Sequence, residues 1–240
     1  MTASDFVLAA LGWRNDVPNI ADRDNQPSVR IAEALFEALD VPTGQEGPPG
    51  GGRLLEEGVK AELQRQLPEH VPDRDWSINR HRSITDFAQY EHLARLQALI
   101  EQDESRTLSA EIGREYIIKP DVTVAIGSGG SVLLHAAVSC KWTIRSDRVQ
   151  NIRHEAVILT RHRRGRQPHI VAVTLEPLPS RLAAIARGTG EIDGVYHMAL
   201  NELRAAVEGA APGSQLATLD ELMDQRRLFD FGDLAAVLSL

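Results

Sequence analysis

Hydrophobic side chains recur at three- and four-residue steps in three parts of the first hundred residues, which is the spacing of one helix face. The first stripe predicts a helix within the first forty residues. The second predicts a helix from Leu54 onward, and the third predicts a helix from about Thr85, a residue type that caps helices. The stripes are Ile31, Ala34, Leu35 and Leu39; Leu54, Leu55, Val59, Leu63 and Leu67; and Phe87, Tyr90, Leu93, Leu96, Leu99 and Ile100.

Two segments between these stripes predict loops. Residues 42–53, PTGQEGPPGGGR, are rich in Pro and Gly and are expected to be neither helix nor central strand. Residues 68–82 contain Pro68, Pro72 and a run of charges, so we expect a loop there as well.

The pattern changes in the middle of the chain to β-branched residues that alternate with other types. Residues 116–126 and 131–144 predict two strands, and the Gly-rich residues 127–130 predict the turn of a hairpin. A helix running into a basic loop, a buried strand over 169–177, a helix, turn and strand over 180–198, and a capped helix in the tail follow. We therefore expect an α/β fold with a small mixed sheet flanked by helices, in one domain of residues 1–240.

Composition excludes several classes of protein. With 42% hydrophobic and 25% charged residues among 240, the chain is ordinary for a globular protein and unlike a disordered one. The single cysteine, Cys140, excludes an intrachain disulfide and a zinc site of several cysteines. No apolar run reaches the roughly 18–20 residues of a membrane span, and the start of the chain has no basic region typical of a signal peptide. We expect a cytoplasmic protein that does not bind membranes.

Charge is distributed unevenly. The chain carries a formal net charge of −8, which argues against a protein coated in DNA-binding surface. Residues 141–168, however, hold eight Lys and Arg against two acids. A basic block inside an acidic chain suits a local face that binds a polyanion, but a solvated loop with arginines for solubility fits the charge equally well.

The predicted hairpin holds residue types suited to phosphodiester hydrolysis. Asp121 lies on one strand and Lys141 ends the next, so antiparallel pairing would bring them to the same sheet edge. A carboxylate binds Mg²⁺, and a lysine beside it can position a water and offset transition-state charge. Ser139 stands where many metal nucleases have a second acid and is a weaker ligand. Glu155, on the helix that follows, is the candidate for the missing negative charge.

The segment Ser-Cys-Lys-Trp-Thr-Ile-Arg-Ser-Asp-Arg-Val-Gln-Asn-Ile-Arg-His-Glu-Ala, residues 139–156, resembles the active-site and recognition segment of the NgoMIV-type restriction endonucleases. These enzymes form a branch of the PD-(D/E)XK nuclease superfamily in which the second acid is displaced from the strand to a helix. The resemblance extends over residues 174–197 and to the C-terminal LDELMDQRRLFDFGDL. It implies a restriction-endonuclease-like core with the metal site at the strand ends.

The resemblance also implies roles for single residues. Asp121, the carbonyl oxygen of Cys140 and Glu155 would be ligands of Mg²⁺, and Lys141 would be the catalytic lysine. The family uses a further glutamate from an upstream helix, for which Glu56 is the best match. Glu57 is a close competitor, and either is alternatively a solvated helix charge. The family often has a longer insertion between the aspartate and the lysine than this chain has.

Three residues after the lysine match the base-reading residues of the family: Arg145, Asp147 and Arg148. Arginine donates two hydrogen bonds to guanine O6 and N7 in the major groove, and aspartate accepts one from cytosine N4. Two arginines and one aspartate suit two adjacent G·C pairs, and two-fold symmetry would extend them to a CCGG core. The alternative is a surface salt-bridge cluster. Arg161, Arg163, Arg164 and Arg166 suit phosphate contacts that carry no sequence information.

These observations predict a type II restriction endonuclease that uses Mg²⁺ to cleave double-stranded DNA at a CCGG-containing palindrome, and the resemblance implies a cut that leaves 5′ extensions. The alternatives are a nuclease of the same superfamily with a DNA repair or processing role, and a nuclease-derived DNA-binding module without catalysis. The resemblance further implies a homodimer or homotetramer and a cognate DNA methyltransferase in the same cell. The bases that flank CCGG are left open.

Overall fold

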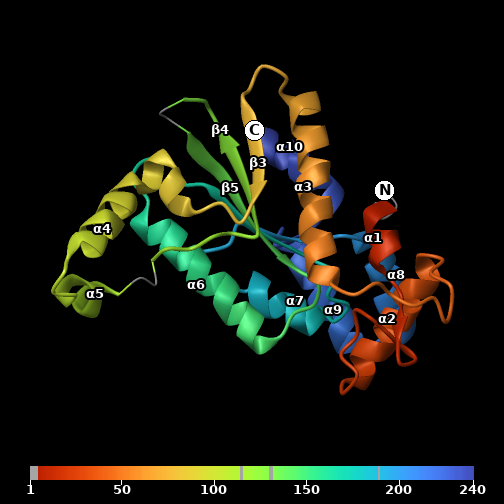
Figure 1. The fold of residues 1–240 in the computed structure, drawn as a ribbon. Coiled ribbons are helices and arrows are strands. Elements are labelled where there is room, and N and C mark those ends of the chain that lie inside the picture. Colours follow the sequence, from red (N-terminus) through yellow and green to blue (C-terminus); the bar gives the residue numbers. More distant parts are fainter. Residues whose placement is uncertain (1–4, 114–115, 130–131, 189) are drawn as a thin grey trace.

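A six-stranded mixed sheet forms the centre of the molecule in the computed structural model, which describes residues 5–113, 116–129, 132–188 and 190–240 (Figure 1). The strand order is β3-β4-β5-β6-β7-β8. The pairs β3–β4 and β4–β5 are antiparallel, and the pairs from β5 to β8 are parallel. The strands are β3 (Trp76–Arg80), β4 (Val122–Ile126), β5 (Leu133–Lys141), β6 (His169–Thr174), β7 (Gly194–His197) and β8 (Leu228–Asp230); a separate pair is β1 (Trp13–Arg14) with β2 (Val17–Pro18).

Helices flank this sheet, so the predicted α/β architecture is confirmed. They are α1 (Asp5–Ala10), α2 (Gln26–Ala38), α3 (Gly51–His70), α4 (Glu91–Gln102), α5 (Thr107–Ile112), α6 (Ser146–His162), α7 (Pro179–Ala186), α8 (Leu200–Ala210), α9 (Gly213–Asp224) and α10 (Leu234–Ser239). Short 3₁₀ turns cover Ile84–Asp86, Ala88–Tyr90 and Phe231–Asp233. Among the described residues, no helix is both long and apolar enough to cross a membrane.

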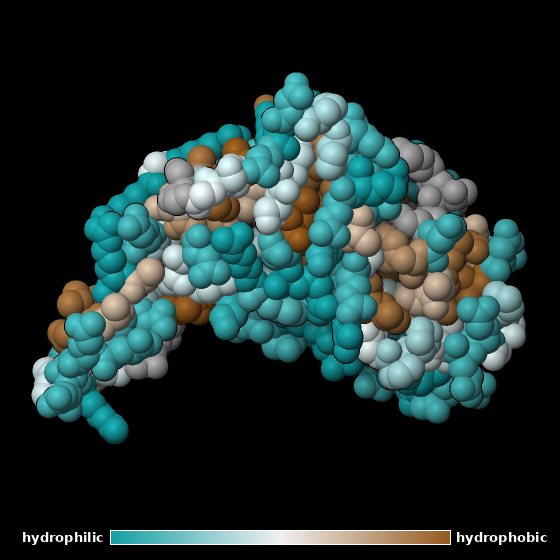
Figure 2. All heavy atoms as spheres, turned by 45° about the horizontal axis from the view of Figure 1, so that its top comes forward, coloured by the Kyte–Doolittle hydropathy of each residue, from teal (hydrophilic) through white to brown (hydrophobic). Residues whose placement is uncertain are grey.

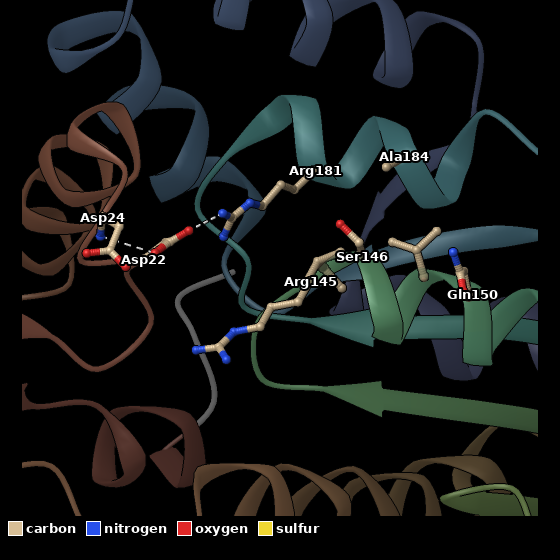
Figure 3. A pocket seen from close by; sticks show the side chains of 9 residues that line it. Asp22, Asp24, Arg145, Ser146, Gln150, Arg181 and Ala184 are labelled. Carbon is tan, nitrogen blue, oxygen red and sulfur yellow. Dashed lines mark hydrogen bonds and ion pairs between the residues drawn. The ribbon is translucent and has the colours of Figure 1, made fainter.

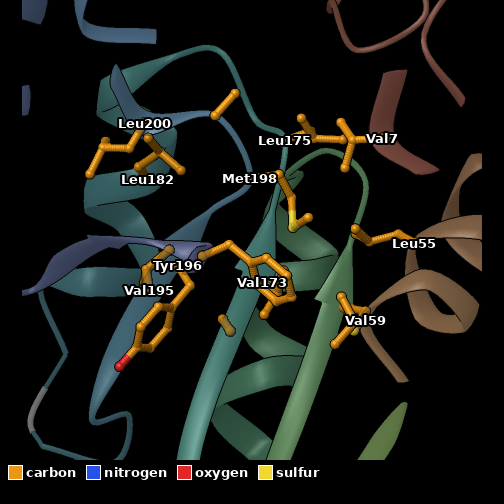
Figure 4. Close-up of a cluster of buried hydrophobic side chains, with 14 of the residues drawn as sticks. Val7, Leu55, Val59, Val173, Leu175, Leu182, Val195, Tyr196, Met198 and Leu200 are labelled. Atoms are coloured by element: carbon orange, nitrogen blue, oxygen red, sulfur yellow. The ribbon is translucent and has the colours of Figure 1, made fainter. Parts of the chain in front are cut away.

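Two groups of buried side chains pack on the sheet. The larger group includes Leu55 and Val59 of α3 and extends to the strands and the C-terminal helices (Figure 4). The smaller group joins α6 and the segment before α4 to the sheet. Along β5, Val138 and Cys140 belong to the larger group and Ala137 belongs to the smaller, because successive strand residues point to opposite faces. The sheet therefore lies between α3 on one face and α6 on the other.

The two strands of the predicted hairpin are confirmed as β4 and β5, which are shorter than predicted, while residues 130 and 131 at its predicted turn lie outside the described residues. This pair of strands sets the position of the predicted site. In the antiparallel pair, Val122 at the start of β4 faces Val138 near the end of β5. β5 and β6 are parallel, and Lys141 at the end of β5 pairs with Thr174 at the end of β6. The start of β4 and the ends of the parallel strands therefore meet at one edge of the sheet.

The two loops predicted in the N-terminal half are wrong in part. The loop predicted over 42–53 ends early, because Gly50 adopts a left-handed conformation (φ 79°) and α3 begins at Gly51. Helix α3 also continues through Pro68, whose missing N–H removes only one hydrogen bond near the helix end. The loop predicted over 68–82 contains β3, an edge strand with one buried residue, Ile78, and hence no clear alternation.

The third helix begins later than predicted. The Ser83 hydroxyl, not Thr85, accepts the capping hydrogen bond, and it caps only a short 3₁₀ turn. Phe87 is extended (φ −111°, ψ 143°) and interrupts the helical path. The α-helix starts at Glu91, while Phe87 and Tyr90 remain buried as the apolar stripe predicts.

Candidate active site

An aspartate and a lysine meet at the sheet edge described above. Lys141 Nζ donates a hydrogen bond to Asp121 Oδ2 at 2.6 Å, and the backbone N–H of Cys140 donates to the same oxygen at 2.8 Å. The side chains of Lys141 and Asp121 are only 20% and 17% exposed. The β4–β5 register places them side by side, and the remaining carboxylate oxygen of Asp121 is left for another partner.

Glu155 reaches the same edge from α6, fourteen positions beyond the lysine. Burial raises the pKa of Glu155 to about 7; the positive charge of Lys141 opposes this shift and the negative charge of Asp121 adds to it. The half-buried carboxylate forms no hydrogen bond or ion pair with another described residue. The two carboxylates and the lysine therefore share one partly dry environment.

Ser139 and Cys140 precede the lysine and point to opposite faces of β5. Ser139 is 7% exposed and lies on the face of Lys141, toward α6. The Cys140 thiol is buried on the α3 face, and burial together with the charge of Asp121 raises its pKa well above the usual value. A thiol in this state is a poor nucleophile and a poor metal ligand, which agrees with the resemblance, since that implies the carbonyl oxygen of Cys140 and not its thiol as a ligand.

Glu56 approaches the site from α3, on the other face of the sheet. Its Oε2 accepts from Arg80 Nη2 at 2.5 Å and lies 3.0 Å from His81 Nε2, and the side chain is 14% exposed. The charge of Glu56 is among the lesser causes that raise the pKa of the Cys140 thiol. Glu57 is 42% exposed and pairs with both Arg53 and Arg80, so Glu56 is the more buried of the two candidate acids.

The donors at this edge suit a hard cation. Asp121, Glu155 and the Cys140 carbonyl would offer oxygen ligands, which Mg²⁺ prefers, and Mg²⁺ usually takes only one or two carboxylates and keeps several waters. No group of three or more His, Cys, Asp or Glu side chains within the described ranges is arranged to hold a metal ion. A site with two protein carboxylates fits Mg²⁺ better than a metal that needs a full cage of side chains.

The three predicted base-reading residues lie at the start of α6, just after the Lys141 strand end. Arg145 is the N-cap residue, exposed, and its guanidinium forms no hydrogen bond or ion pair within the described part of the chain. Asp147 is exposed as well. Arg148 is held by its own chain, because its Nη1 donates to the Thr143 carbonyl at 2.6 Å and to the Thr143 hydroxyl at 3.0 Å.

A pocket of about 530 Å³ opens beside Arg145, between α6, α7 and the segment before α2 (Figure 3). Arg181 on α7 donates a hydrogen bond to Asp22 across it. This bond is the main cause of the lowered pKa of Asp22. Arg145 extends into open space on the same side and leaves its donors free (Figure 3).

Sequence patterns did not single out two residues that the structure places beside the predicted site. Arg80 ends β3 and bridges Glu56 and Glu57, whose carboxylates it holds at 2.5 and 3.0 Å. Glu176 is fully buried two residues after β6 and accepts the N–H of Ile144. The sequence does carry a signal for Glu176, because it is an acid inside the apolar run Thr-Leu-Glu-Pro-Leu-Pro and falls within residues 174–197, where the family resemblance extends.

The chain has clear relatives among known proteins. The profile described as NgoMIV restriction enzyme matches residues 5–128 and 124–240. The type II restriction enzyme NgoMIV of Neisseria gonorrhoeae is 36% identical over 272 residues, covering 98% of this chain and 94% of the relative. The structure of the pre-specific restriction endonuclease BsaWI bound to DNA aligns over 62% of this chain and 52% of that one, at 18% identity and a TM-score of 0.35, too weak a likeness to bear on function. The chain belongs to the NgoMIV restriction enzyme family.

Proposed function

We propose that this type II restriction endonuclease uses Mg²⁺ to hydrolyse double-stranded DNA at a palindrome with a CCGG core and leaves 5′ extensions. The observation that carries the proposal is one continuous segment. In this segment, Lys141 ends strand β5 and contacts Asp121. Four residues later, Arg145, whose guanidinium has no partner among the described residues, is the N-cap of helix α6. A single segment thus links a hydrolytic pair to a group able to read a base edge.

In the proposed reaction, Lys141 orients the attacking water toward the scissile phosphate and offsets charge that develops on its oxygens. Asp121, Glu155 and the carbonyl of Cys140 would supply oxygen atoms beside the lysine. A bound Mg²⁺ would supply Lewis-acid stabilisation of the phosphate charge. Glu56, which Arg80 orients, would supply the further carboxylate from the α3 face of the sheet.

Ser139 is not a metal ligand in this proposal, but it marks a position on the strand. Its hydroxyl lies on the strand where a second carboxylate would be expected, and it carries no charge. The charge comes from Glu155 instead, because a cation requires negative oxygen at a point in space, whichever element delivers it. The raised pKa of Glu155, caused chiefly by burial, is consistent with a carboxylate placed for a cation.

DNA recognition is assigned to Arg145, Asp147 and Arg148 in the major groove. The arginines suit guanine O6 and N7 and the aspartate suits cytosine N4. Arg148 must exchange its bonds to Thr143 for base contacts or use its remaining N–H groups. Palindromic recognition calls for a two-fold assembly, a homodimer or homotetramer, and protection of host DNA calls for a cognate methyltransferase.

The surface is consistent with a ligand as broad as duplex DNA. Figure 2 shows a molecule of arched outline, hydrophilic over most of the face in view. The helix that starts at Ser146 also ends in a basic segment, with Arg161 in its last turn and Arg163, Arg164 and Arg166 beyond it. These side chains are assigned to phosphates, which position the duplex without reading its sequence.

The test is digestion of a sequenced plasmid by the purified protein with Mg²⁺, followed by sequencing of every end. Discrete cuts, all at CCGG-containing palindromes with four-base 5′ extensions, support the proposal. Discrete cuts at another sequence would overturn the base-reading assignment. Cuts without sequence preference would favour a processing nuclease, and binding without cleavage would favour a non-catalytic module.

A further inference from the structure

A buried carboxylate outside the proposed catalytic group lies beneath the turn that joins the strand to the base-reading helix. Glu176 is 0% exposed and follows β6. Because Lys141 pairs with Thr174 in the parallel register, Glu176 comes just beyond the strand end beside residues 142–145. Neither the proposed hydrolysis nor the proposed base contacts use this carboxylate.

Both carboxylate oxygens of Glu176 accept hydrogen bonds from backbone N–H groups. Oε2 accepts the N–H of Ile144 at 2.7 Å, and Oε1 accepts the N–H of Leu178 at 3.1 Å. Its own N–H donates to the hydroxyl of Thr174 at 3.1 Å. Arg181 Nη1 lies 3.9 Å from Oε1. The carboxylate therefore connects the end of β6, the start of α7 and the turn before α6.

Burial of an acid is costly, and this one is not retained for packing. Burial raises the pKa of Glu176 to about 7, while the N–H of Ile144 and the charge of Arg181 oppose the shift. An apolar side chain would fill the same space without the desolvation cost. It would, however, leave the N–H of Ile144 without an acceptor in the interior, where an unpaired backbone donor is strongly disfavoured.

The turn over 142–145 is held at both of its ends, in addition to the hydrogen bonds that Arg148 donates to Thr143 in its middle. At its beginning, the indole of Trp142 packs against α3, where a Cβ added to Gly51 would lie 2.9 Å from the ring, and its Nε1 donates to the Asn19 carbonyl at 3.2 Å. At its end, Ile144 is held by Glu176. Arg145 follows Ile144 directly, so the Glu176 bond sets the position from which the free arginine extends.

We propose that Glu176 is a positioning residue for sequence discrimination. It fixes Arg145 relative to Lys141, so that Arg145 can contact its base while the scissile phosphate of the same duplex lies at Lys141. The inference rests on the proposed function and deepens it. Glu176 touches neither DNA nor the reacting atoms; it acts through the backbone of Ile144. Its loss should loosen recognition while leaving the Asp121–Lys141 pair in place.

Glu176→Gln tests this, because an amide keeps the size but turns one acceptor into a donor. One of the two N–H groups, of Ile144 or Leu178, then faces an NH₂ group. The ratio of kcat/KM for a CCGG duplex to that for a duplex with one core base pair changed should fall about tenfold, as expected for the loss of one hydrogen bond of this kind. A general loss of activity on both duplexes is not what a positioning role predicts.

Asp193→Asn is the matched control. Asp193 Oδ2 also accepts a buried backbone N–H, from Ile170 at 2.9 Å, but at the opposite end of β6. It should lower thermal stability while the discrimination ratio stays within about twofold of wild type. Thr174→Val removes the hydroxyl that holds the Glu176 backbone, and it provides a milder variant, with a smaller fall in the ratio, if Glu176→Gln does not fold.

The outcomes separate the inference from the proposed function. If wild type fails to distinguish CCGG duplexes from altered ones, the proposed function fails and this inference with it. If wild type discriminates and both Glu176→Gln and Thr174→Val discriminate equally well, the proposed function stands and Glu176 has no positioning role. An equal fall for Asp193→Asn would likewise reduce Glu176 to general support of the sheet.

Discussion

Lys141 Nζ and Asp121 Oδ2 lie 2.6 Å apart although the two residues are 20 positions apart in the chain. The contact exists because the start of β4 and the end of β5 share one end of an antiparallel pair. The same carboxylate oxygen also accepts the N–H of Cys140. The aspartate is therefore oriented by the strand that carries the lysine, and its second oxygen is left for a ligand.

Lys141→Ala should lower the cleavage rate by about 10²-fold or more while it leaves binding of a CCGG duplex largely intact. The substitution removes water positioning and transition-state stabilisation but no base contact. Single-turnover cleavage in Mg²⁺ and binding in Ca²⁺ measure the two effects. Arg95→Ala, which removes an exposed cation of α4, should cut normally. Cleavage by Lys141→Ala at the wild-type rate would show that the active site lies elsewhere.

Glu155→Ala should behave as an active-site variant although Glu155 belongs to a helix. Adding Ser139→Glu to that variant should restore part of the cleavage, because Ser139 lies on the same face of β5 as Lys141 and returns a carboxylate to the strand. Cleavage at several Mg²⁺ concentrations is the measurement. Unchanged activity of Glu155→Ala would reduce the residue to a helix charge, and the matching single variant Ser139→Glu controls for damage to the strand.

Arg145→Ala should weaken binding to a CCGG duplex by about 1–3 kcal/mol for each guanine that the arginine no longer reads, and two-fold symmetry doubles this penalty. Binding to a scrambled duplex should change little. Arg161→Ala is the matched control, because Arg161 lies at the other end of α6. The control variant should bind both duplexes more weakly, to the same extent, and its binding should depend less on salt. If Arg145→Ala weakened binding to both duplexes equally, Arg145 would contact the DNA backbone and not a base.

His135→Gln should flatten the dependence of stability on pH in the acid range. Burial lowers the pKa of His135 to about 4, with the charges of His169, Arg166 and Arg74 acting in the same direction and the Leu238 carbonyl opposing. In the unfolded chain the histidine binds a proton near pH 6.5. The neutral, buried His135 therefore contributes of the order of 3 kcal/mol to the free energy of unfolding. This contribution is complete above pH 6.5 and is lost as the pH falls toward 4.

Chemical denaturation of wild type and His135→Gln at pH 7.5 and pH 4.5 tests this expectation. Glutamine keeps a donor for the Leu238 carbonyl, which lies 2.7 Å from His135 Nε2. Wild type should lose more stability than the variant between the two values. Identical losses would mean that His135 is charged in the folded protein or does not titrate separately.

Gly58→Ala should destabilise the protein by about 1–3 kcal/mol, although alanine is normally favoured over glycine in a helix. A Cβ at this position would lie 2.0 Å from Cδ2 of the Phe6 ring, so α1 and α3 could not keep their distance. Gly209→Ala, in α8 with nothing within 4 Å of the added Cβ, should stabilise by up to about 1 kcal/mol. Thermal unfolding of both variants decides whether close packing at Gly58 is required.

The sequence by itself determined the features that depend on neighbours in the chain. Alternating residues around a Gly-rich turn predict β4 and β5, and an apolar stripe predicts α2, because strand and helix periods are local. The spacing of Asp121 and Lys141 around that hairpin was enough to expect them at one sheet edge. The segment from Ser139 onward was enough to suggest the family that the comparisons show.

The tertiary structure alone decided the features that depend on distant partners. β3 is a strand because β4 supplies its hydrogen bonds, not because its own residues alternate. Glu56 is distinguished from Glu57 only by its burial and its contact with His81, because Arg80 pairs with both carboxylates. Glu176 has a role only because β6 ends beside β5 and the N–H of Ile144 needs an acceptor. Each depends on residues brought together by sheet order, and sheet order is a property of the whole fold that no local pattern contains.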